Sequence, residues 1–326
     1  MVSAEPWVIT VAVFVGVMMI FAFYKTSEDR RKNTFTNRHL LKKDMELPVI
    51  WIYYDNSDVN SRWWYDFGAR SSRVLNLPFL NLCYQTIVEQ NKNLYRIEII
   101  SGLSDLALRF GGWEALPTRL QNPNVASIRE GELNWIRAAV LAKYGGLWLS
   151  PTSICLQGFG QLPTDKVVFY GSDRAQSFAG HEGTRAPAFN AVWSPIPAHP
   201  CWVEVEKRQR KRLDNGNGGL DIRGDAKSDF VEIFEQRDDV EIRPNQELSR
   251  MGTQGKPIQL EDLLAAGQEG KIHFAVPSGT VFVSLPWPEL RDRRMFGWFL
   301  RMSETQILES DLVISELFRQ SLPNGI

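Results

Sequence analysis

The sequence predicts a single-pass membrane protein whose body is one α/β domain, with a mostly parallel sheet flanked by helices. Three observations predict this class: an uncharged apolar run near the N-terminus, an alternation of strand-like and helix-like segments after residue 47, and the overall composition. Of 326 residues, 44% are hydrophobic and 23% are charged. These values exclude long disordered, collagen-like and polytopic membrane proteins.

The charge balance and the cysteines exclude two further classes. Lys and Arg number 37 against 38 Asp and Glu, which gives a net charge of −1. A protein held on nucleic acid by phosphate contacts needs a basic surface, so we expect no nucleic-acid partner. The three cysteines are far apart and fit neither a disulfide framework nor zinc-ligand spacing, which favours a reducing compartment. They are Cys83, Cys155 and Cys201.

The first element is an anchor over residues 1–24, in which residues 7–24 read WVITVAVFVGVMMIFAFY without a charge. As a helix these eighteen residues rise about 27 Å, close to the thickness of a bilayer's hydrocarbon core. The segment before them contains no Lys or Arg, and no small-residue cleavage site follows the run, so an uncleaved span is favoured over a signal peptide. We expect this segment to contact the lipid bilayer.

The second element is a basic linker over residues 25–46. Its first nineteen residues contain seven Lys or Arg against Glu28 and Asp29, a net charge of +5, whereas only Glu5 is charged before the span. The positive-inside rule therefore places the body on the cytosolic face and the linker against anionic headgroups. We expect protein partners in a membrane-associated assembly. A membrane-containing virion, whose shell assembles on the cytosolic side of an internal membrane, is one setting that fits this topology.

The body, residues 47–326, begins with alternating elements. An apolar run at 47–55 predicts a buried strand, and helical spacing at 80–90 is followed by a strand at 94–100 and a short helix at 103–110. A strong helix at 131–144 ends at Gly145 and leads into a strand at 147–150, with another strand at 166–171. This βαβ rhythm predicts a mostly parallel sheet with helices on both faces.

Beyond Trp202 the pattern is looser. Residues 207–212 form a basic helix end, and residues 214–225 have the composition of a loop. Two short strands are expected within residues 272–285, interrupted by residues 277–279. Ser303 and Gln306 have the spacing of a capping box, which predicts one amphipathic helix over 303–318.

The segment 134–159 resembles the sugar-nucleotide core of the capsular polysaccharide synthesis type of glycosyltransferase, related to the DxD-containing sugar-binding families of GT-A fold. The family motif has the form S-D-x-x-R-x-x-x-L-x-x-Y-G-G-x-W-x-D-x-D/T. The resemblance covers residues 47–205 most clearly, since residues 48–55 match the first strand and His199 with Pro200 matches a His-Pro step. The matching motif residues are Arg137, Leu141, Tyr144, Gly145, Gly146 and Trp148.

The resemblance implies a GT-A-like, Rossmann-like fold, with the equivalents of the nucleotide-sugar site at Asp55, Asn134, Arg137, Gly145, Gly146, Trp148, Ser150 and Thr152. The family's carboxylates hold a divalent cation that neutralises the departing pyrophosphate. Here Ser150 and Thr152 replace the DxD-like carboxylates, and Asn134 replaces the helix Asp. We therefore expect no metal and no cofactor, and we assign no catalytic residue.

Two functions stay open at this point. The first is a catalytically degenerate protein that serves as a structural or binding component of a membrane-associated assembly. Its matching motif positions would then support the fold. The second is an active glycosyltransferase that transfers a sugar from a nucleotide sugar to a glycan or protein acceptor. This enzyme would use Mn²⁺ or Mg²⁺ with acids from elsewhere, such as Asp55, Asp58 or Asp173.

Aromatic residues are plentiful, with eleven tryptophans in the chain. Tryptophan can stack on sugar rings or anchor an interface, but most of these residues are expected in the core. The best candidates for exposure are Trp63, Trp64 and Trp287. His199 is expected to be a loop histidine and not a catalytic base.

Overall fold

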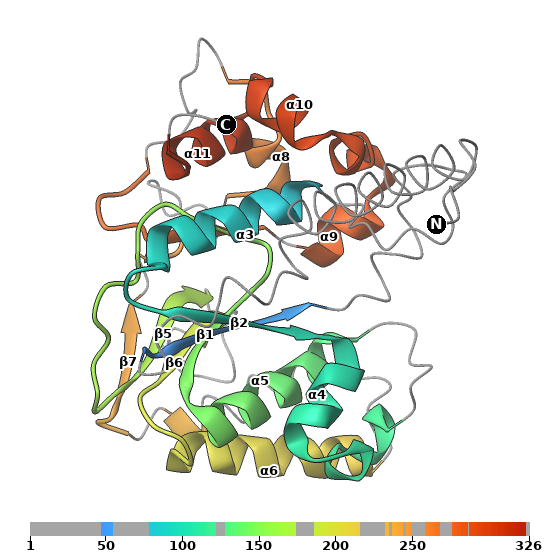
Figure 1. Ribbon diagram of the computed structural model, residues 1–326, viewed down its shortest axis with the longest axis vertical. Coiled ribbons are helices and arrows are strands. Elements are labelled where there is room, and N and C mark those ends of the chain that lie inside the picture. The colour runs from blue at the N-terminus through green and yellow to red at the C-terminus, as the bar shows by residue number, and fades with distance from the viewer. Residues whose placement is uncertain are drawn as a thin grey trace, which may run out of the picture.

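A computed structural model gives the fold of the chain (Figure 1). It describes residues 47–54, 78–121, 128–173, 186–215, 232–234, 237–243, 246–248, 258–267, 276–285 and 287–323. The predicted anchor and basic linker lie outside these residues. None of the helices in the described ranges is long and apolar enough to cross a membrane.

A six-stranded sheet forms the centre of the molecule, in the order β2-β1-β3-β6-β5-β7. The pairs β1–β2, β1–β3 and β5–β7 are parallel, whereas β6 is antiparallel to both β3 and β5. Five of these six strands therefore run in one direction, which confirms the expected mostly parallel sheet. The strands are β1 (Val49–Tyr54), β2 (Arg96–Ser101), β3 (Gly146–Leu149), β5 (Val167–Asp173), β6 (Ala186–Ser194) and β7 (Val240–Arg243).

Helices cover both faces of this sheet (Figure 1). One face carries α4 (Gly102–Phe110), α5 (Glu130–Tyr144) and α6 (Pro200–Asp214). The other carries α3 (Pro78–Asn91), α8 (Leu260–Leu263), α9 (Trp287–Asp292), α10 (Glu304–Glu309) and α11 (Val313–Ser321). A small second sheet pairs β4 (Ser153–Cys155) with β8 (Phe282–Ser284) in antiparallel fashion. Short 3₁₀ helices lie at η3 (Trp113–Ala115), η4 (Thr118–Leu120), η6 (Arg294–Phe296) and η7 (Phe299–Arg301).

Each face of the sheet has its own hydrophobic core. Leu147 and Leu149 point into the cluster under α3 and α11, whereas Trp148 points into the cluster under α5 and α6. This alternation is the period of two expected for a strand buried on both faces. The three cysteines are free and buried among these clusters.

Most elements expected in the first half of the body are confirmed, with ends shifted by one or two residues. The helix expected at 131–144 is α5, and Gly145 follows it as C-cap with φ +64°. The strand expected at 147–150 is β3, and those expected at 47–55, 94–100 and 166–171 are β1, β2 and β5. Strands β4, β6 and β7 were not predicted.

The helix expected over 303–318 is wrong as one element. The capping box at Ser303 and Gln306 is present, but α10 ends at Glu309 and α11 begins at Val313. Between them Leu312 forms an antiparallel bridge with Ala266, and the Val313 amide donates to the Ala265 carbonyl at 3.0 Å. This tertiary pairing requires extended backbone, which interrupts the helix. Of the two strands expected within 272–285, β8 is present, and residues 272–275 lie outside the described ranges.

The direction of the elements defines two edges of the sheet. Strands β1 and β3 run in parallel, so the residues that follow them meet at one edge, here named the carboxyl edge. Helix α3 leads into β2 and α5 leads into β3, so both helices begin near the carboxyl edge and end near the opposite, amino edge. Ligands of open α/β sheets bind at the carboxyl edge, so the polar residues at this edge are the first candidates for a functional site.

Candidate functional site

The end of β3 brings Ser150 and Thr152 to the carboxyl edge. The Thr152 hydroxyl donates to the Leu285 carbonyl oxygen at 3.0 Å, and the hydroxyls of Ser150 and Thr152 lie 3.1 Å apart. Because the Thr152 proton goes to Leu285, Ser150 is the donor between the two hydroxyls. The Ser150 amide in turn donates to the Asn190 carbonyl oxygen at 2.7 Å, and Thr152 is only 2% exposed. Both predicted site residues are therefore bonded within the protein.

Helix α5 brings Asn134, Arg137 and Trp148 together on the other face of the sheet. The Arg137 guanidinium donates to the Asn134 side-chain oxygen at 2.7 Å and lies 3.9 Å from a Glu130 carboxylate oxygen. Its central carbon lies 5.7 Å from the Trp148 ring centroid and 5.3 Å from that of Phe189. Arg137 is 3% exposed, so this cation is held against aromatic faces inside the fold.

A buried carboxylate near the end of β3 was not predicted. Glu247 is 1% exposed, and its carboxylate accepts a hydrogen bond from the Asn190 side chain at 2.7 Å. A Cβ atom on Gly171 would lie 2.1 Å from the other carboxylate oxygen, and Gly171 has φ +89°. Glycine at this position of β5 therefore makes room for the carboxylate. Neither Asn190 nor Glu247 lies in a recognisable motif, so the sequence carries no signal for them.

Gly145 and Gly146 lie at the amino edge, away from Ser150 and Thr152. Both have positive φ, and a Cβ atom on Gly146 would lie 2.6 Å from the Val49 carbonyl oxygen. The Gly145 carbonyl accepts a hydrogen bond from the Trp51 indole at 2.9 Å. These glycines allow the tight turn from α5 into β3 and do not join the polar residues at the carboxyl edge.

The alternative acids are placed only in part. Asp55 and Asp58 lie outside the described residues, as do Trp63 and Trp64. The backbone of Asp173 ends β5, in register with Ala186 of β6. Of the aromatic candidates, Trp287 is half-buried with its ring 5.8 Å from that of Phe79.

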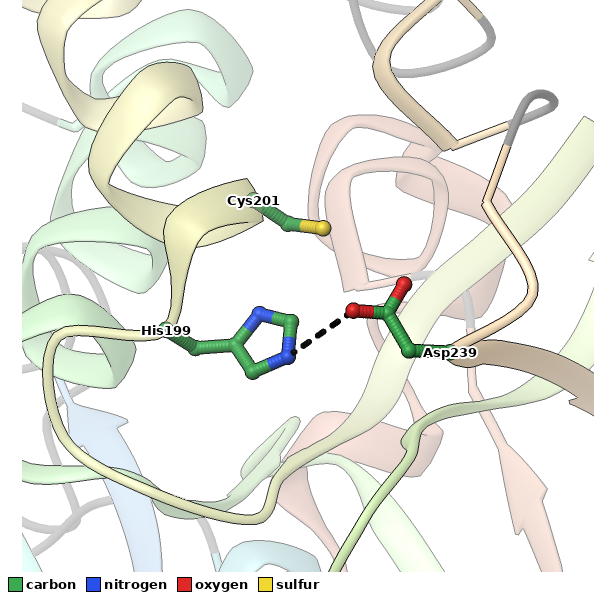
Figure 2. A group of neighbouring side chains, drawn as sticks. All are labelled: His199, Cys201 and Asp239. Carbon is green, nitrogen blue, oxygen red and sulfur yellow. Dashed lines mark ion pairs between the residues drawn. The ribbon is translucent and has the colours of Figure 1, made fainter.

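A second polar cluster lies at the amino edge, where His199, Cys201 and Asp239 meet (Figure 2). His199 is the N-cap of α6, Cys201 lies in its first turn, and Asp239 directly precedes β7. The His199 Nε2 atom lies 3.5 Å from an Asp239 oxygen, and one ligand atom from each residue falls within 4.8 Å of the others. Such a set has the residue types of a metal site.

The charges around this cluster do not suit a cation. Both Asp239 oxygens accept hydrogen bonds from the Arg237 guanidinium, at 2.8 and 2.7 Å, and this pairing holds the Asp239 pKa below its usual range. Burial raises the pKa of the Cys201 thiol to about 11, so the sulfur keeps its proton. Burial, reinforced by Arg237, lowers the His199 pKa, although Asp239 opposes the shift. The cluster is therefore an ion pair beside a neutral imidazole and a thiol, and it joins α6 to β7.

The lowered His199 pKa makes stability depend on pH. Because the unfolded chain binds the proton more readily, we expect stability from this residue to be complete above pH about 6.5 and to decline as pH falls toward the folded-state pKa. Urea unfolding between pH 7.5 and 5.5 should show a steeper loss in the unmodified chain than in His199→Gln. Equal slopes in the two proteins would contradict a neutral, buried His199.

Comparison with known proteins finds distant structural similarity to two transferases and assigns the chain to no family. No protein-family model and no curated protein matches the chain. Among solved structures, the PaToxG glycosyltransferase is 13% identical over 65% of this chain and 80% of its own, with a TM-score of 0.36. A mutant transferase is 10% identical over 60% of this chain and 87% of its own, with a TM-score of 0.35. Likeness at these scores assigns no activity to the chain.

Proposed function

We propose that this chain is a membrane-anchored, glycosyltransferase-like protein that does not carry out metal-dependent sugar transfer and acts as a binding or structural component of a membrane-associated assembly. Support for its kinship comes from the motif residues Arg137, Tyr144, Gly145, Gly146 and Trp148, which occupy one helix–turn–strand unit. This unit ends at the carboxyl edge of a mostly parallel sheet, where open α/β folds bind their ligands.

The observation that carries the proposal is the hydrogen bonding of Ser150 and Thr152. A cation held at the end of β3 would need oxygen lone pairs directed toward it. The Thr152 hydroxyl directs its proton to the Leu285 carbonyl and one of its two lone pairs to Ser150, so at most one of its lone pairs remains for a cation. Neutral hydroxyls that already bond to each other and to the backbone provide little charge compensation for a pyrophosphate.

The rest of the described edge does not suit Mg²⁺ or Mn²⁺ either. These ions prefer several charged oxygen ligands, whereas Asn134 and Asn190 contribute neutral amides. Glu247 brings one carboxylate to this edge, but it is buried and accepts a hydrogen bond from Asn190. The Asn134 oxygen is bonded to Arg137 and so is part of the support of that cation. The donor set therefore fits a folded polar network better than a metal centre.

An active transferase is the second candidate, and Glu247 is the observation that favours it. If the bond from Asn190 opened, this carboxylate would lie near the backbone that follows β3, because the Asn190 carbonyl also accepts from the Ser150 amide. One carboxylate is fewer than the family's motif supplies, so we place this function second.

Equilibrium binding of nucleoside diphosphates tests the proposal. Titration of the full chain with UDP, GDP and ADP should give weak binding, and millimolar Mn²⁺ should change each affinity by less than about twofold, a difference under about 0.5 kcal/mol. Metal-dependent binding in the micromolar range, near −8 kcal/mol, or hydrolysis of a nucleotide sugar, would contradict the proposal.

A matched pair of variants gives the control for that titration. Ser150→Asp combined with Thr152→Asp adds the charge that the family's motif carries, whereas Ser150→Asn with Thr152→Asn adds similar volume without charge. A tenfold gain in Mn²⁺-dependent affinity for the Asp pair alone, about 1.4 kcal/mol, would show that missing charge limits binding. Equal affinities for the two pairs would show that the edge is closed by packing.

The proposed anchor has its own test, since residues 7–24 lie outside the described ranges. Because a net charge of +5 follows this segment, the body should face the cytosol. Protease added to sealed vesicles with their cytosolic face outward should therefore digest the body. A body that is protected from the protease, or that washes off the vesicles in high salt, would overturn the proposed topology or the anchor.

A further inference from the structure

A surface hollow of about 480 Å³ lies beside η7 and α10, on the face of the sheet that α3 covers. Its lining combines one tryptophan with charged and polar side chains: Trp298, Arg301, Met302, Gln306, Glu309 and Ser310. The hollow is shallow and open to solvent, so a ligand would lie against its lining and would not be enclosed. Helix α3 begins at the carboxyl edge, and its Phe79 ring lies 5.6 Å from that of Phe299 in η7. The hollow beside η7 therefore lies toward the carboxyl edge.

Trp298 is the aromatic surface of this hollow. Its side chain is 43% exposed, whereas the neighbouring Phe299 is fully buried. The two rings meet edge to face at 6.0 Å and 81°, so a core residue orients the exposed ring. An exposed indole held in one orientation is an apolar platform on which a flat, partly apolar ligand can stack.

Three polar groups around Trp298 are available to a ligand, whereas the Ser310 hydroxyl is bonded to the Ile307 carbonyl and the Ser315 hydroxyl. Within the part of the chain that the structure describes, the Arg301 guanidinium and the Glu309 carboxylate have no hydrogen-bond or ion-pair partner. Gln306 is oriented by its capping box, in which its side-chain oxygen accepts from the Ser303 amide at 2.9 Å, leaving the amide nitrogen as a donor. The hollow thus offers a guanidinium, a carboxylate and an amide.

The charges select among ligand classes. One cation and one anion cancel, so the hollow does not favour a phosphate or nucleoside diphosphate, which would be drawn to Arg301 and repelled by Glu309. A neutral sugar unit matches all three features: its apolar ring face can stack on indole, and its hydroxyls can both donate to a carboxylate and accept from a guanidinium and an amide. Anionic lipid headgroups fit less well, because Glu309 would face them.

We propose that this hollow binds a neutral saccharide, with Trp298 as its stacking platform. This inference goes beyond the proposed function, because it does not require a nucleotide or a metal at the carboxyl edge. The site would let the protein hold a glycan, whether or not any sugar is transferred.

Saturation-transfer NMR tests the inference on the full chain, kept in a detergent without a sugar headgroup. The probes are neutral trisaccharides built from glucose, galactose, mannose and N-acetylglucosamine, with UDP as a separate ligand. At least one trisaccharide should bind, and Trp298→Ala should weaken it by at least about tenfold, as expected for loss of an aromatic stacking partner. Glu309→Gln should also weaken it, whereas UDP binding should be unchanged in both variants.

Met295→Ala is the matched control, because Met295 is 61% exposed on the same segment but does not line the hollow. This variant should bind the trisaccharide within about twofold of the unmodified chain. Absence of saccharide binding at about 10 mM, or binding that survives Trp298→Ala, would overturn the inference. Phosphatidylserine vesicles bound through Trp298, with no saccharide bound, would overturn it in favour of a membrane contact.

Discussion

Strand β3 can take its place at the centre of the sheet because Gly146 has no side chain. A Cβ atom there would lie 2.6 Å from the Val49 carbonyl oxygen and 3.0 Å from the Trp51 indole nitrogen. The same indole donates to the Gly145 carbonyl, so the turn from α5 is bonded to β1. This close approach of β1 and β3 determines where Trp148 lies in β3 and where Ser150 lies directly after it.

Because successive side chains of β3 point to opposite faces of the sheet, they contact different parts of the molecule. Trp148 points toward α5, where its ring and that of Phe189 lie against Arg137. Ser150 comes after the last paired residue and reaches the carboxyl edge, where its hydroxyl bonds to Thr152. A nucleotide-binding protein could direct the Arg137 guanidinium to a phosphate, but here this cation packs between helix α5 and the sheet. The polar residues after β3 form hydrogen bonds to Asn190 and Leu285.

The sequence was most informative where local signals and tertiary packing agree. The helical spacing of α5, the glycine that follows it and the apolar run after that glycine predicted the bounds of α5 and β3 to within one residue. It was least informative where distant segments decide the outcome. The pairing of Leu312 with Ala266 breaks a helix that the capping box at Ser303 correctly begins.

The same reason explains which site residues were missed. The burial of Glu247 depends on the absence of a side chain at Gly171 in β5 and on the side-chain amide of Asn190 in β6. Exposure of aromatic residues is also a tertiary property: Trp298 is exposed and Trp287 is half-buried with its ring against that of Phe79. Motif positions predicted Ser150 and Thr152 but not their hydrogen-bond partners.

We propose that the end of β3 is a closed polar network and not a metal centre. Diffraction from crystals grown with UDP and Mn²⁺, collected at the manganese absorption edge, tests it most directly. No anomalous peak is expected near Ser150, Thr152 or Glu247, and the hydroxyl bonds to each other and to Leu285 should be intact. A manganese peak within about 2.5 Å of oxygen atoms of these residues, a distance typical of coordination by hard ligands, would contradict it.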